Sequence, residues 1–282
     1  FLRDYGKYFN INYMLDKDII RRRLETGITY TEFSYMIMQA LDFLHLYENK
    51  NCILQVAGSD QWGNITAGVD LIKKKTGNEA YGFTMPLVTD KFGNKFGKSA
   101  GNALWLDKNK TSSYEIYQYL INSDDEKVID YLKIFTFLTK EEIEELEKKN
   151  ISNPELREAH SALAREVITF IHSKEDFEKA EKISKSLFSG NIKNLNVDEI
   201  LEGFKDVPSF EINEDISLID ILVNNKISSS KREARELINA GSISINGDKI
   251  TDENIIVNHL AIDNKLIVIK RGKKKYYLGI IK

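Results

Sequence analysis

The chain has 282 residues, of which 42% are hydrophobic and 29% charged, and its net charge is −3. This composition is typical of ordinary folded proteins, and the apolar runs are too short to predict a membrane span. One cysteine, Cys52, and four scattered histidines exclude an internal disulfide framework and a zinc motif, so we expect no protein-held metal.

The first residues lack the charged-then-apolar layout of a secretion signal, and the absence of disulfides is typical of a reducing compartment. We therefore expect a cytoplasmic protein with no membrane partner. Basic residues outnumber acidic ones over 216–282, whereas the remainder of the chain is acidic. This distribution favours an appended module for a polyanion, with a merely solvated lysine-rich surface as the alternative.

Helical and strand-like patterns alternate up to about residue 107. Apolar residues recur at helical spacing over 29–48, which predicts a helix. The apolar run 52–57 ends before a glycine and predicts a buried strand, a helix is expected over 61–76, and 84–88 is a further candidate strand. This alternation favours a parallel α/β sheet.

From Thr111 to about Gly203 the chain is expected to be helical. Four potential capping boxes mark helix starts, with Ser or Thr followed three residues later by an acid: Ser112 with Glu115, Ser123 with Glu126, Thr139 with Glu142, and Ser173 with Asp176. Periodic apolar residues supply the inner faces of these helices. A helical domain beside the α/β part is therefore predicted.

Residues 204–215 contain Pro208 and several acids, which predicts a linker. A small α+β module is expected beyond it. KREARELI forms its helix, and SISINGDKI predicts a hairpin that turns at Asn246–Gly247. Late strands are expected over 266–269 and 276–281.

Three polar side chains share one face of the predicted helix 29–48. Tyr35, Gln39 and Asp42 stand at i, i+4 and i+7 among Met, Leu, Ile and Phe. A phenol, an amide and a carboxylate in such a stripe must be solvated, paired or bound to a ligand. The alternative is an amphipathic surface helix whose wet side carries them.

The sequence GSDQWGN, residues 58–64, stands between a predicted strand and a predicted helix. Ligands of parallel α/β sheets gather outside the carboxyl ends of the strands. Gly58 permits close backbone approach, and the Asp60 carboxylate is suited to the two hydroxyls of a ribose. Alternatively, Ser59 or Asp60 only caps the helix.

The segment DKFGNKFGKSAGN, residues 90–102, holds Lys95, Lys98 and Ser99 among glycines. Glycines leave backbone N–H groups accessible and lysines add positive charge, so a phosphate chain is a suitable ligand. It is not a P-loop, because its glycine spacing is one residue short and no helix is expected after Ser99. A mobile glycine–lysine hairpin is the alternative.

Together, these elements resemble the tyrosyl-tRNA synthetases, a class I synthetase family. TEFSYMIMQALDFLHL resembles the family's tyrosine-pocket helix, GSDQWGNI its central strand-to-helix motif, and KFGKS its form of the mobile KMSKS loop. The last module, with SKREARELINAG and SISING, is similar to the S4 RNA-binding domain of bacterial-type members. The resemblance covers essentially the whole chain.

The resemblance implies an α/β fold with four parts. These are the C-terminal half of a partial Rossmann-like class I catalytic domain (1–110), an all-helical anticodon-binding-type domain (111–203), the linker (204–215) and a small α+β S4-like RNA-binding domain (216–282). The implied activity is that of a tyrosine–tRNA ligase, which activates L-tyrosine with ATP to tyrosyl-adenylate and transfers it to tRNA-Tyr. A homodimer is also implied.

The resemblance assigns roles to residues that match the family's motifs. Tyrosine binding falls to Tyr35, Gln39, Asp42, Gln55 and Gln61. ATP binding falls to Gly58, Asp60, Lys95 and Lys98, and catalysis to Lys95, Lys98 and Ser99. Mg²⁺ would accompany ATP as its substrate complex. RNA binding falls to the basic residues of the last module, namely Lys231, Arg232, Arg235, Lys270, Arg271, Lys273, Lys274 and Lys275.

Two features depart from the family. Class I synthetases carry an early HIGH motif, and none of the four histidines lies in a similar sequence. The chain also begins with Phe1 rather than Met. We expect a fragment without the HIGH-motif half, either cropped, processed or incomplete, that is inactive alone. The alternatives are a noncatalytic tRNA-binding or RNA-binding synthetase remnant and a pseudo-enzyme that binds tyrosine without activating it.

Overall fold

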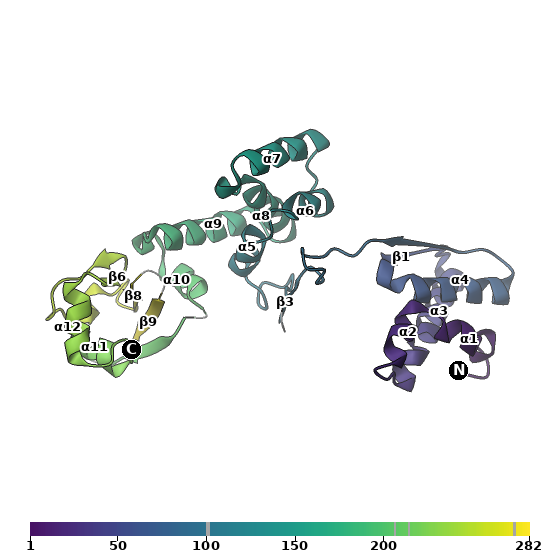
Figure 1. The fold of residues 1–282 in the computed structure, drawn as a ribbon, viewed down its shortest axis with the longest axis horizontal. Helices are drawn as coiled ribbons and strands as arrows, with labels where there is room; N and C mark the ends of the chain where they lie inside the picture. Colours follow the sequence, from purple (N-terminus) through teal and green to yellow (C-terminus); the bar gives the residue numbers. More distant parts are fainter. Residues whose placement is uncertain (100–101, 206, 214, 273–274) are drawn as a thin grey trace. The chain divides into compact units, whose positions relative to one another are not determined.

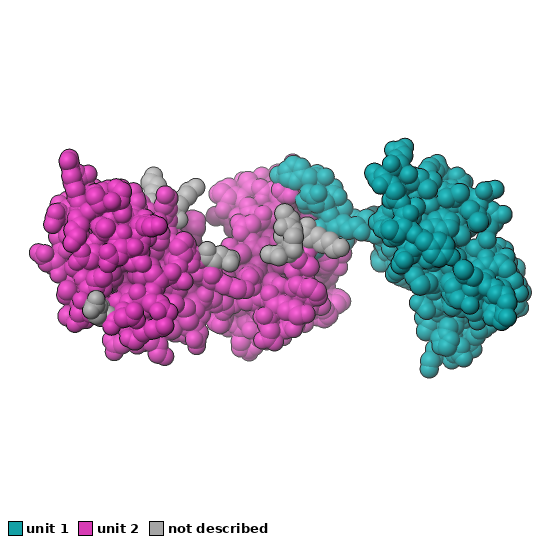
Figure 2. Space-filling view, turned by 90° about the horizontal axis from the view of Figure 1, so that it is seen from below, with its two compact units in different colours: residues 1–96 teal, residues 97–282 magenta. Residues whose placement is uncertain are grey.

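The computed structural model describes residues 1–99, 102–205, 207–213, 215–272 and 275–282. The chain forms two compact units, Phe1–Phe96 and Gly97–Lys282, which Figure 2 colours separately. Within the described ranges, none of the helices has both the length and the apolar character of a membrane span.

The first unit combines four helices with a two-stranded parallel sheet (Figure 1). The helices are α1 (Ile11–Leu15), α2 (Asp18–Leu24), α3 (Tyr30–Lys50) and α4 (Trp62–Thr76). The strands are β1 (Leu54–Gly58) and β2 (Tyr81–Met85), joined through α4 as parallel strands require. The predicted α/β alternation is confirmed, although β2 lies a few residues before the candidate strand 84–88.

Helix α3 follows directly from its sequence. The Thr29 side chain accepts from the Glu32 backbone N–H and the Glu32 carboxylate accepts from the Thr29 N–H, so both cap the first turn. The helix ends at Asn51, whose φ of 54° lies in the left-handed region. Its apolar stripe packs on α4, with Phe43 and Leu44 fully buried in a shared cluster.

The β1–β2 sheet is covered on one face only. A Cβ at Gly82 would come within 2.5 Å of the Ile65 side chain, so α4 lies directly on this glycine. On the other face Leu54, Val56 and Phe83 are about half exposed. The prediction of a fully buried strand over 52–57 is therefore wrong, because α4 is packed on only one side of β1.

The second unit begins with a helical region. Its helices are α5 (Ser113–Ile121), α6 (Val128–Phe135), α7 (Lys140–Ser152), α8 (Glu158–Ile171), α9 (Lys174–Ser189) and α10 (Val197–Gly203). The boxes at Ser112 and Thr139 are confirmed, and Ser173 caps α9. The box predicted at Ser123 is wrong, because this hydroxyl donates to the Leu120 carbonyl and closes α5 instead.

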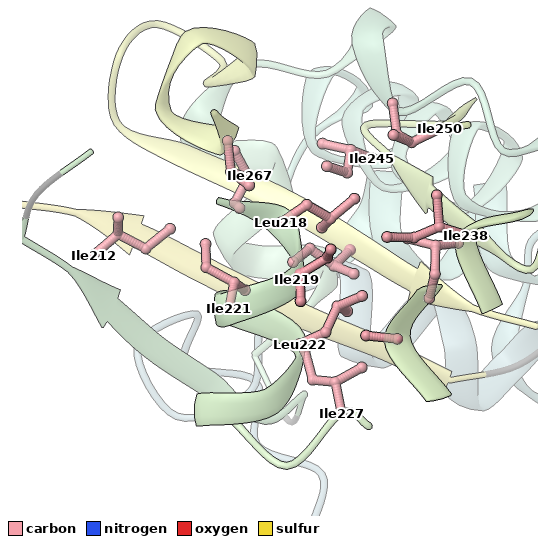
Figure 3. Packing of buried hydrophobic residues seen from close by; sticks show 14 residues of the cluster. Ile212, Leu218, Ile219, Ile221, Leu222, Ile227, Ile238, Ile245, Ile250 and Ile267 are labelled. Carbon is pink, nitrogen blue, oxygen red and sulfur yellow. The ribbon is translucent and has the colours of Figure 1, made fainter. Parts of the chain in front are cut away.

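The unit continues with a five-stranded sheet and two helices. Its strand order is β5-β9-β8-β6-β7, where β5 is Ser209–Ile212, β6 Ile243–Ile245, β7 Asp248–Lys249, β8 Leu266–Arg271 and β9 Lys275–Ile281. Helices α11 (Leu218–Asn224) and α12 (Lys231–Asn239) cover the sheet. Figure 3 shows their core, in which isoleucine and leucine side chains from helices and strands interdigitate.

Two details of this module bear on the predictions. The hairpin turns at Asn246–Gly247 as predicted, with φ values of 50° and 93°. The stretch 204–215, predicted as a linker, contains β5 and the buried Phe204. Phe204 belongs to a second cluster, in which apolar residues of α9 and α10 pack against β8 and β9. The last module therefore packs against the helical region.

Candidate functional site

Helix α3 presents the predicted polar stripe on its accessible side. Tyr35 is 55% exposed, Gln39 is half-buried and Asp42 is exposed, whereas the adjacent Met36 and Phe43 are buried. The three polar side chains therefore share a face that a ligand or solvent can reach.

A hollow of about 230 Å³ lies at the start of this stripe. Tyr35 and Met36 of α3 line it together with Gln61 and Asn64, where the Asn64 amide donates to the Gln61 side-chain oxygen at 2.9 Å. The structure thus brings together Tyr35 and Gln61, two of the predicted tyrosine-binding residues. The volume of this hollow is below the range of drug-sized ligand pockets and suits a small ligand.

Gln55 of β1, a predicted tyrosine-pocket residue, has a buried polar atom. Its side-chain oxygen Oε1 is buried and has no hydrogen-bond partner among the described residues. A buried acceptor without a partner is costly, and such groups are commonly completed by water or a ligand.

The chain between β1 and α4 shapes the next part of the site. β1 ends at Gly58, residues Ser59–Gln61 form one 3-10 turn, and α4 starts at Trp62. Gln61 occupies the N-cap position, and no described side chain caps the first turn of α4. The alternative that Ser59 or Asp60 serves as the helix cap is therefore wrong. A Cβ at Gly58 would come within 2.8 Å of Leu87, which explains the glycine.

Asp60 is paired with a lysine from the glycine–lysine segment. The Lys95 Nζ donates to Asp60 Oδ2 at 2.8 Å, and both side chains remain partly exposed. The hydrogen bond from Lys95 holds the pKa of the Asp60 carboxyl below its usual value. Two predicted ATP-binding residues that lie 35 positions apart in sequence are thereby in direct contact.

Lys95 is placed by a short hairpin. The Phe96 N–H donates to the Val88 carbonyl at 2.9 Å, and Thr89 pairs with Lys95. Within the turn, the Asp90 carboxylate accepts from the backbone N–H groups of Phe92 and Asn94. The segment thus forms a hairpin, and this hairpin directs Lys95 to Asp60.

A larger hollow of about 660 Å³ opens beside Asp60. Ser59, Gly63 and Leu87 line one part of it. The other part is mainly basic, since it contains four cations and two acids, of which Asp16 pairs with Arg21 at 2.9 Å: Lys17, Arg21, Arg22, Arg23, Asp16 and Asp18. A carboxylate next to a cationic wall suits a ligand that carries both hydroxyls and phosphates. The sequence prediction missed this basic wall, because the pattern of residues 17–23 does not reveal that they face Asp60.

Arg23 also lines the smaller hollow, where it pairs with Glu32 at 2.7 Å. The two hollows therefore share a wall. Two consecutive residues also connect them, since Asp60 lines the larger hollow and Gln61 lines the smaller one.

Lys98 and Ser99 lie near the start of the second unit. Their backbone forms the short strand β3 (Lys98–Ser99), which pairs antiparallel with β4 (Asn102–Ala103). Their side chains lie outside what the structure describes. The predicted catalytic roles of Lys98 and Ser99 stay predictions.

The basic residues predicted for RNA on α12 are accessible but paired. Lys231 contacts Asp220 at 2.7 Å, Arg232 contacts Glu236 at 3.0 Å, and Arg235 contacts Glu253 at 3.3 Å. The Arg232 side chain is nevertheless 90% exposed. These acids neutralise part of the charge that the sequence pattern suggested.

The predicted basic turn between β8 and β9 is only partly described. Arg271 is engaged inside the module, where it donates to the Ile227 carbonyl and to Glu233. Lys270 lies over the Tyr276 ring, and Lys275 is exposed. Lys273 and Lys274 lie outside the described residues.

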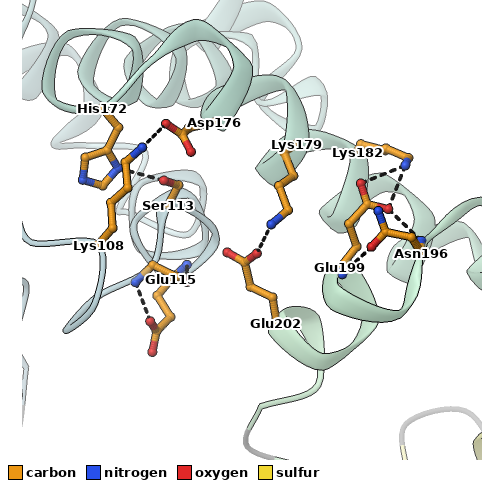
Figure 4. A network of polar contacts seen from close by, with 11 residues as sticks. Lys108, Ser113, Glu115, His172, Asp176, Lys179, Lys182, Asn196, Glu199 and Glu202 are labelled. Atoms are coloured by element: carbon orange, nitrogen blue, oxygen red, sulfur yellow. Dashed lines mark hydrogen bonds and ion pairs between the residues drawn. The ribbon is translucent and has the colours of Figure 1, made fainter. Parts of the chain in front are cut away.

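Ion pairs also tie the helices of the second unit together (Figure 4). Lys179 and Lys182 of α9 reach Glu202 and Glu199 of α10, each at 2.7 Å. Glu199 is buried, and burial alone raises its pKa. The hydrogen bonds from Lys182 and from the Asn196 N–H outweigh burial and hold the pKa of Glu199 below its usual value.

Comparisons with known proteins agree along the chain. Residues 1–189 match the family described as tRNA synthetases class I (W and Y), and residues 199–279 match the tyrosine–tRNA ligase SYY-like C-terminal domain. The tyrosine–tRNA ligase of Bacillus pumilus (strain SAFR-032) is 56% identical, and tyrosine–tRNA ligase 1 of Bacillus subtilis (strain 168) is 55% identical. Both alignments cover 99% of this chain and 67% of the relative.

A solved structure is similar as well. A C-terminally truncated Aspergillus nidulans mitochondrial tyrosyl-tRNA synthetase aligns with a TM-score of 0.56 and 37% identity, over 66% of this chain and 53% of that chain. The chain spans about two thirds of the length of the bacterial relatives.

Proposed function

This chain belongs to the tyrosyl-tRNA synthetases, and we propose that its first unit carries the amino-acid and nucleotide pockets of a tyrosine–tRNA ligase. Enzymes of this class I family use ATP, generally with Mg²⁺. The observation that carries the proposal is the pair of neighbouring hollows, which share Arg23 and are lined by the consecutive residues Asp60 and Gln61. A reaction that joins an amino-acid carboxylate to a nucleotide phosphate needs two such adjoining sites.

The geometry of α3 supports an elongated amino acid as the first substrate. Tyr35 and Asp42 are seven residues apart, which corresponds to about 10 Å along the helix axis. Tyrosine has an ammonium group at one end and a phenolic hydroxyl at the other. Tyr35 and Gln39 would bind the ammonium group, and Asp42 would accept a hydrogen bond from the hydroxyl.

Recognition of the hydroxyl gives a direct test. Phenylalanine has no hydroxyl to donate to the Asp42 carboxylate, so it lacks the charge-assisted hydrogen bond that tyrosine would make there, and a site that binds a substrate hydroxyl discriminates against the analogue without it. The enzyme expressed from the complete gene should activate tyrosine and reject phenylalanine, and Asp42→Ala should lose most of this preference. Equal preference in parent and variant would refute the role of Asp42.

Activation itself needs no general base. The tyrosine carboxylate attacks the α-phosphorus of ATP, a new O–P bond forms, and the P–O bond to pyrophosphate breaks. Positive charge near the leaving pyrophosphate is what the protein must supply, and Lys95, Lys98 and Ser99 are the candidates. Because Lys95 is paired with Asp60 here, we propose that the ribose hydroxyls replace Lys95 at Asp60 and free its ammonium for the phosphates.

The second unit is proposed to bind tRNA-Tyr, with residues 111–203 as an anticodon-binding-type domain and 216–282 as an RNA-binding domain. Deleting 216–282 would uncover the apolar cluster on α9 and α10, so point substitutions test RNA binding better. Lys231→Gln, Arg232→Gln and Arg235→Gln together should weaken tRNA binding and flatten its salt dependence, with Lys265→Gln as the control. Unchanged tRNA affinity in the triple variant would contradict the proposal.

A second candidate function is a noncatalytic tRNA-binding protein. It is favoured by one observation, since the 282 residues contain no sequence that resembles the HIGH motif. We propose that a polypeptide of these residues alone does not activate tyrosine. Tyrosine-dependent ATP–pyrophosphate exchange and a tRNA gel shift, both measured on this polypeptide and on the product of the complete gene, separate the two functions. A homodimer, as the family implies, is tested by light scattering of the same samples.

A further inference from the structure

The backbone next to Lys98 is held by a side chain of the helical region. The Gly97 N–H donates to the Tyr119 hydroxyl at 2.9 Å, and the Gly97 carbonyl accepts from the Leu104 N–H at 3.0 Å. Gly97 has a φ of 73°, in the left-handed region that favours glycine. The Tyr119 hydroxyl therefore fixes a turn whose next residue is the predicted catalytic lysine.

Tyr119 offers a firm attachment because its helix is well anchored. Ile116, Tyr117 and Leu120 of α5 are buried, and α5 packs against both α8 and α9. Tyr119 itself is half-buried. A hydroxyl on such a helix has little freedom to move, so its hydrogen bond transmits the position of α5 to Gly97.

The chain between Gly97 and α5 is also attached at its other end, where residues 106 and 108 contact the end of α8 and the start of α9 (Figure 4). His172 Nε2 lies 2.8 Å from the Leu106 carbonyl, and its Nδ1 lies 2.8 Å from the Ser113 hydroxyl. A carbonyl only accepts, so Nε2 carries the proton, and a neutral ring then accepts from Ser113 through Nδ1. Lys108 is paired with Asp176 of α9. Both ends of the stretch after Gly97 are thus tied to the helical region.

We propose that Tyr119 is a positioning residue for tyrosine activation, whose hydroxyl sets the backbone at Gly97 and so the place of Lys98. This inference rests on the proposed function. Small displacements of a group that stabilises the transition state lower the rate without loosening substrate binding. A hydroxyl with a merely structural role would instead change stability and leave the rate unaltered.

The variant Tyr119→Phe removes only the hydroxyl. In the enzyme expressed from the complete gene, kcat of tyrosine-dependent ATP–pyrophosphate exchange should fall about fivefold or more, with KM for tyrosine unchanged, as expected for the loss of one oriented hydrogen bond. In parallel, the amide of Gly97 should exchange with deuterium about fivefold faster.

The matched control is Tyr114→Phe on the same helix. Tyr114 is also half-buried, and its hydroxyl makes no hydrogen bond within the described part of the chain. This variant should keep the parent kcat within about twofold and leave Gly97 exchange unaltered. A melting temperature of Tyr119→Phe close to that of the parent excludes global unfolding as the cause.

Each outcome decides the inference. Faster Gly97 exchange together with a lower kcat and an unchanged tyrosine KM supports it. Unaltered Gly97 exchange, or faster exchange with the parent kcat, overturns it. If the parent enzyme itself shows no tyrosine-dependent exchange of pyrophosphate, the proposed function fails and the inference falls with it, and that failure is recognised in the parent rather than in the variant.

Discussion

Lys95 forms an ion pair with Asp60, and we propose that it also stabilises the leaving pyrophosphate during tyrosine activation. Replacing Lys95 with alanine separates these two roles. Its ammonium lies 2.8 Å from Asp60, and the two side chains are 50% and 32% exposed. Ion pairs with this exposure contribute about 0.2–1 kcal/mol to stability, because water screens them. Lys95→Ala should therefore lower the free energy of unfolding by less than about 1 kcal/mol.

The expected effect on catalysis is much larger. Removing one group that stabilises developing charge in a transition state costs about 2–4 kcal/mol. At about 1.36 kcal/mol per factor of ten, this corresponds to a loss of about 30- to 900-fold in the rate of tyrosine activation. The pKa of Asp60 should also rise towards its usual value, because the hydrogen bond from Lys95 is the main cause of its depression.

Tyrosine-dependent ATP–pyrophosphate exchange measures the rate, and urea denaturation measures the stability. Lys91→Ala is the matched control, since Lys91 is a lysine of the same hairpin and its ammonium lies over the Phe92 ring. It should change neither quantity appreciably. A Lys95→Ala enzyme with the parent rate, or one destabilised by several kcal/mol, would refute the reasoning.

Three further predictions concern stability and binding. A Cβ at Gly247 would come within 2.4 Å of the Gly190 carbonyl oxygen, just after α9. Gly247→Ala should therefore lower the free energy of unfolding by about 1–3 kcal/mol more than Gly272→Ala, as measured by thermal unfolding. Gly272 is the control because it shares the positive φ, but a Cβ there would meet open space. Hydrogen bonds outweigh burial and hold the pKa of Glu199 below its usual value, so its stabilisation is complete above the unfolded-state pKa and is lost as the pH falls through the folded-state pKa. The unfolding free energies of the parent and Glu199→Gln should therefore converge as the pH falls through that folded-state pKa. Gln55→Met should leave stability within about 1 kcal/mol, because the lost acceptor is unpartnered, while calorimetry should show weaker tyrosine binding.

Local chemistry made much of the fold predictable. The capping box at Thr29 defined the start of α3, and the Asn246–Gly247 dipeptide defined a hairpin turn, because both signals act within a few residues. Ser123 shows the limit of such signals, since its hydroxyl closes the preceding helix instead of opening a new one. The segment 204–215 reads as a linker by composition, but pairing of β5 with the distant β9 makes part of it a strand.

In the candidate site too, features set by local sequence were predictable, whereas contacts between distant residues were not. The stripe of Tyr35, Gln39 and Asp42 follows from helical spacing alone, and the structure confirms the helix that carries it. The contact between Asp60 and Lys95 depends on a hairpin that folds back on the end of β1, which no periodicity encodes. The shared wall at Arg23 likewise arises from packing of α2 beside residues far along the chain.

The most direct test of the central claim is a crystal structure of the enzyme with a nonhydrolysable tyrosyl-adenylate analogue. We predict that the analogue lies across both hollows and that its phenol extends beyond them along α3 to Asp42. Its ribose should bind Asp60 and displace Lys95 from that carboxylate. An analogue bound elsewhere, or one bound while Lys95 stays on Asp60, would contradict the account.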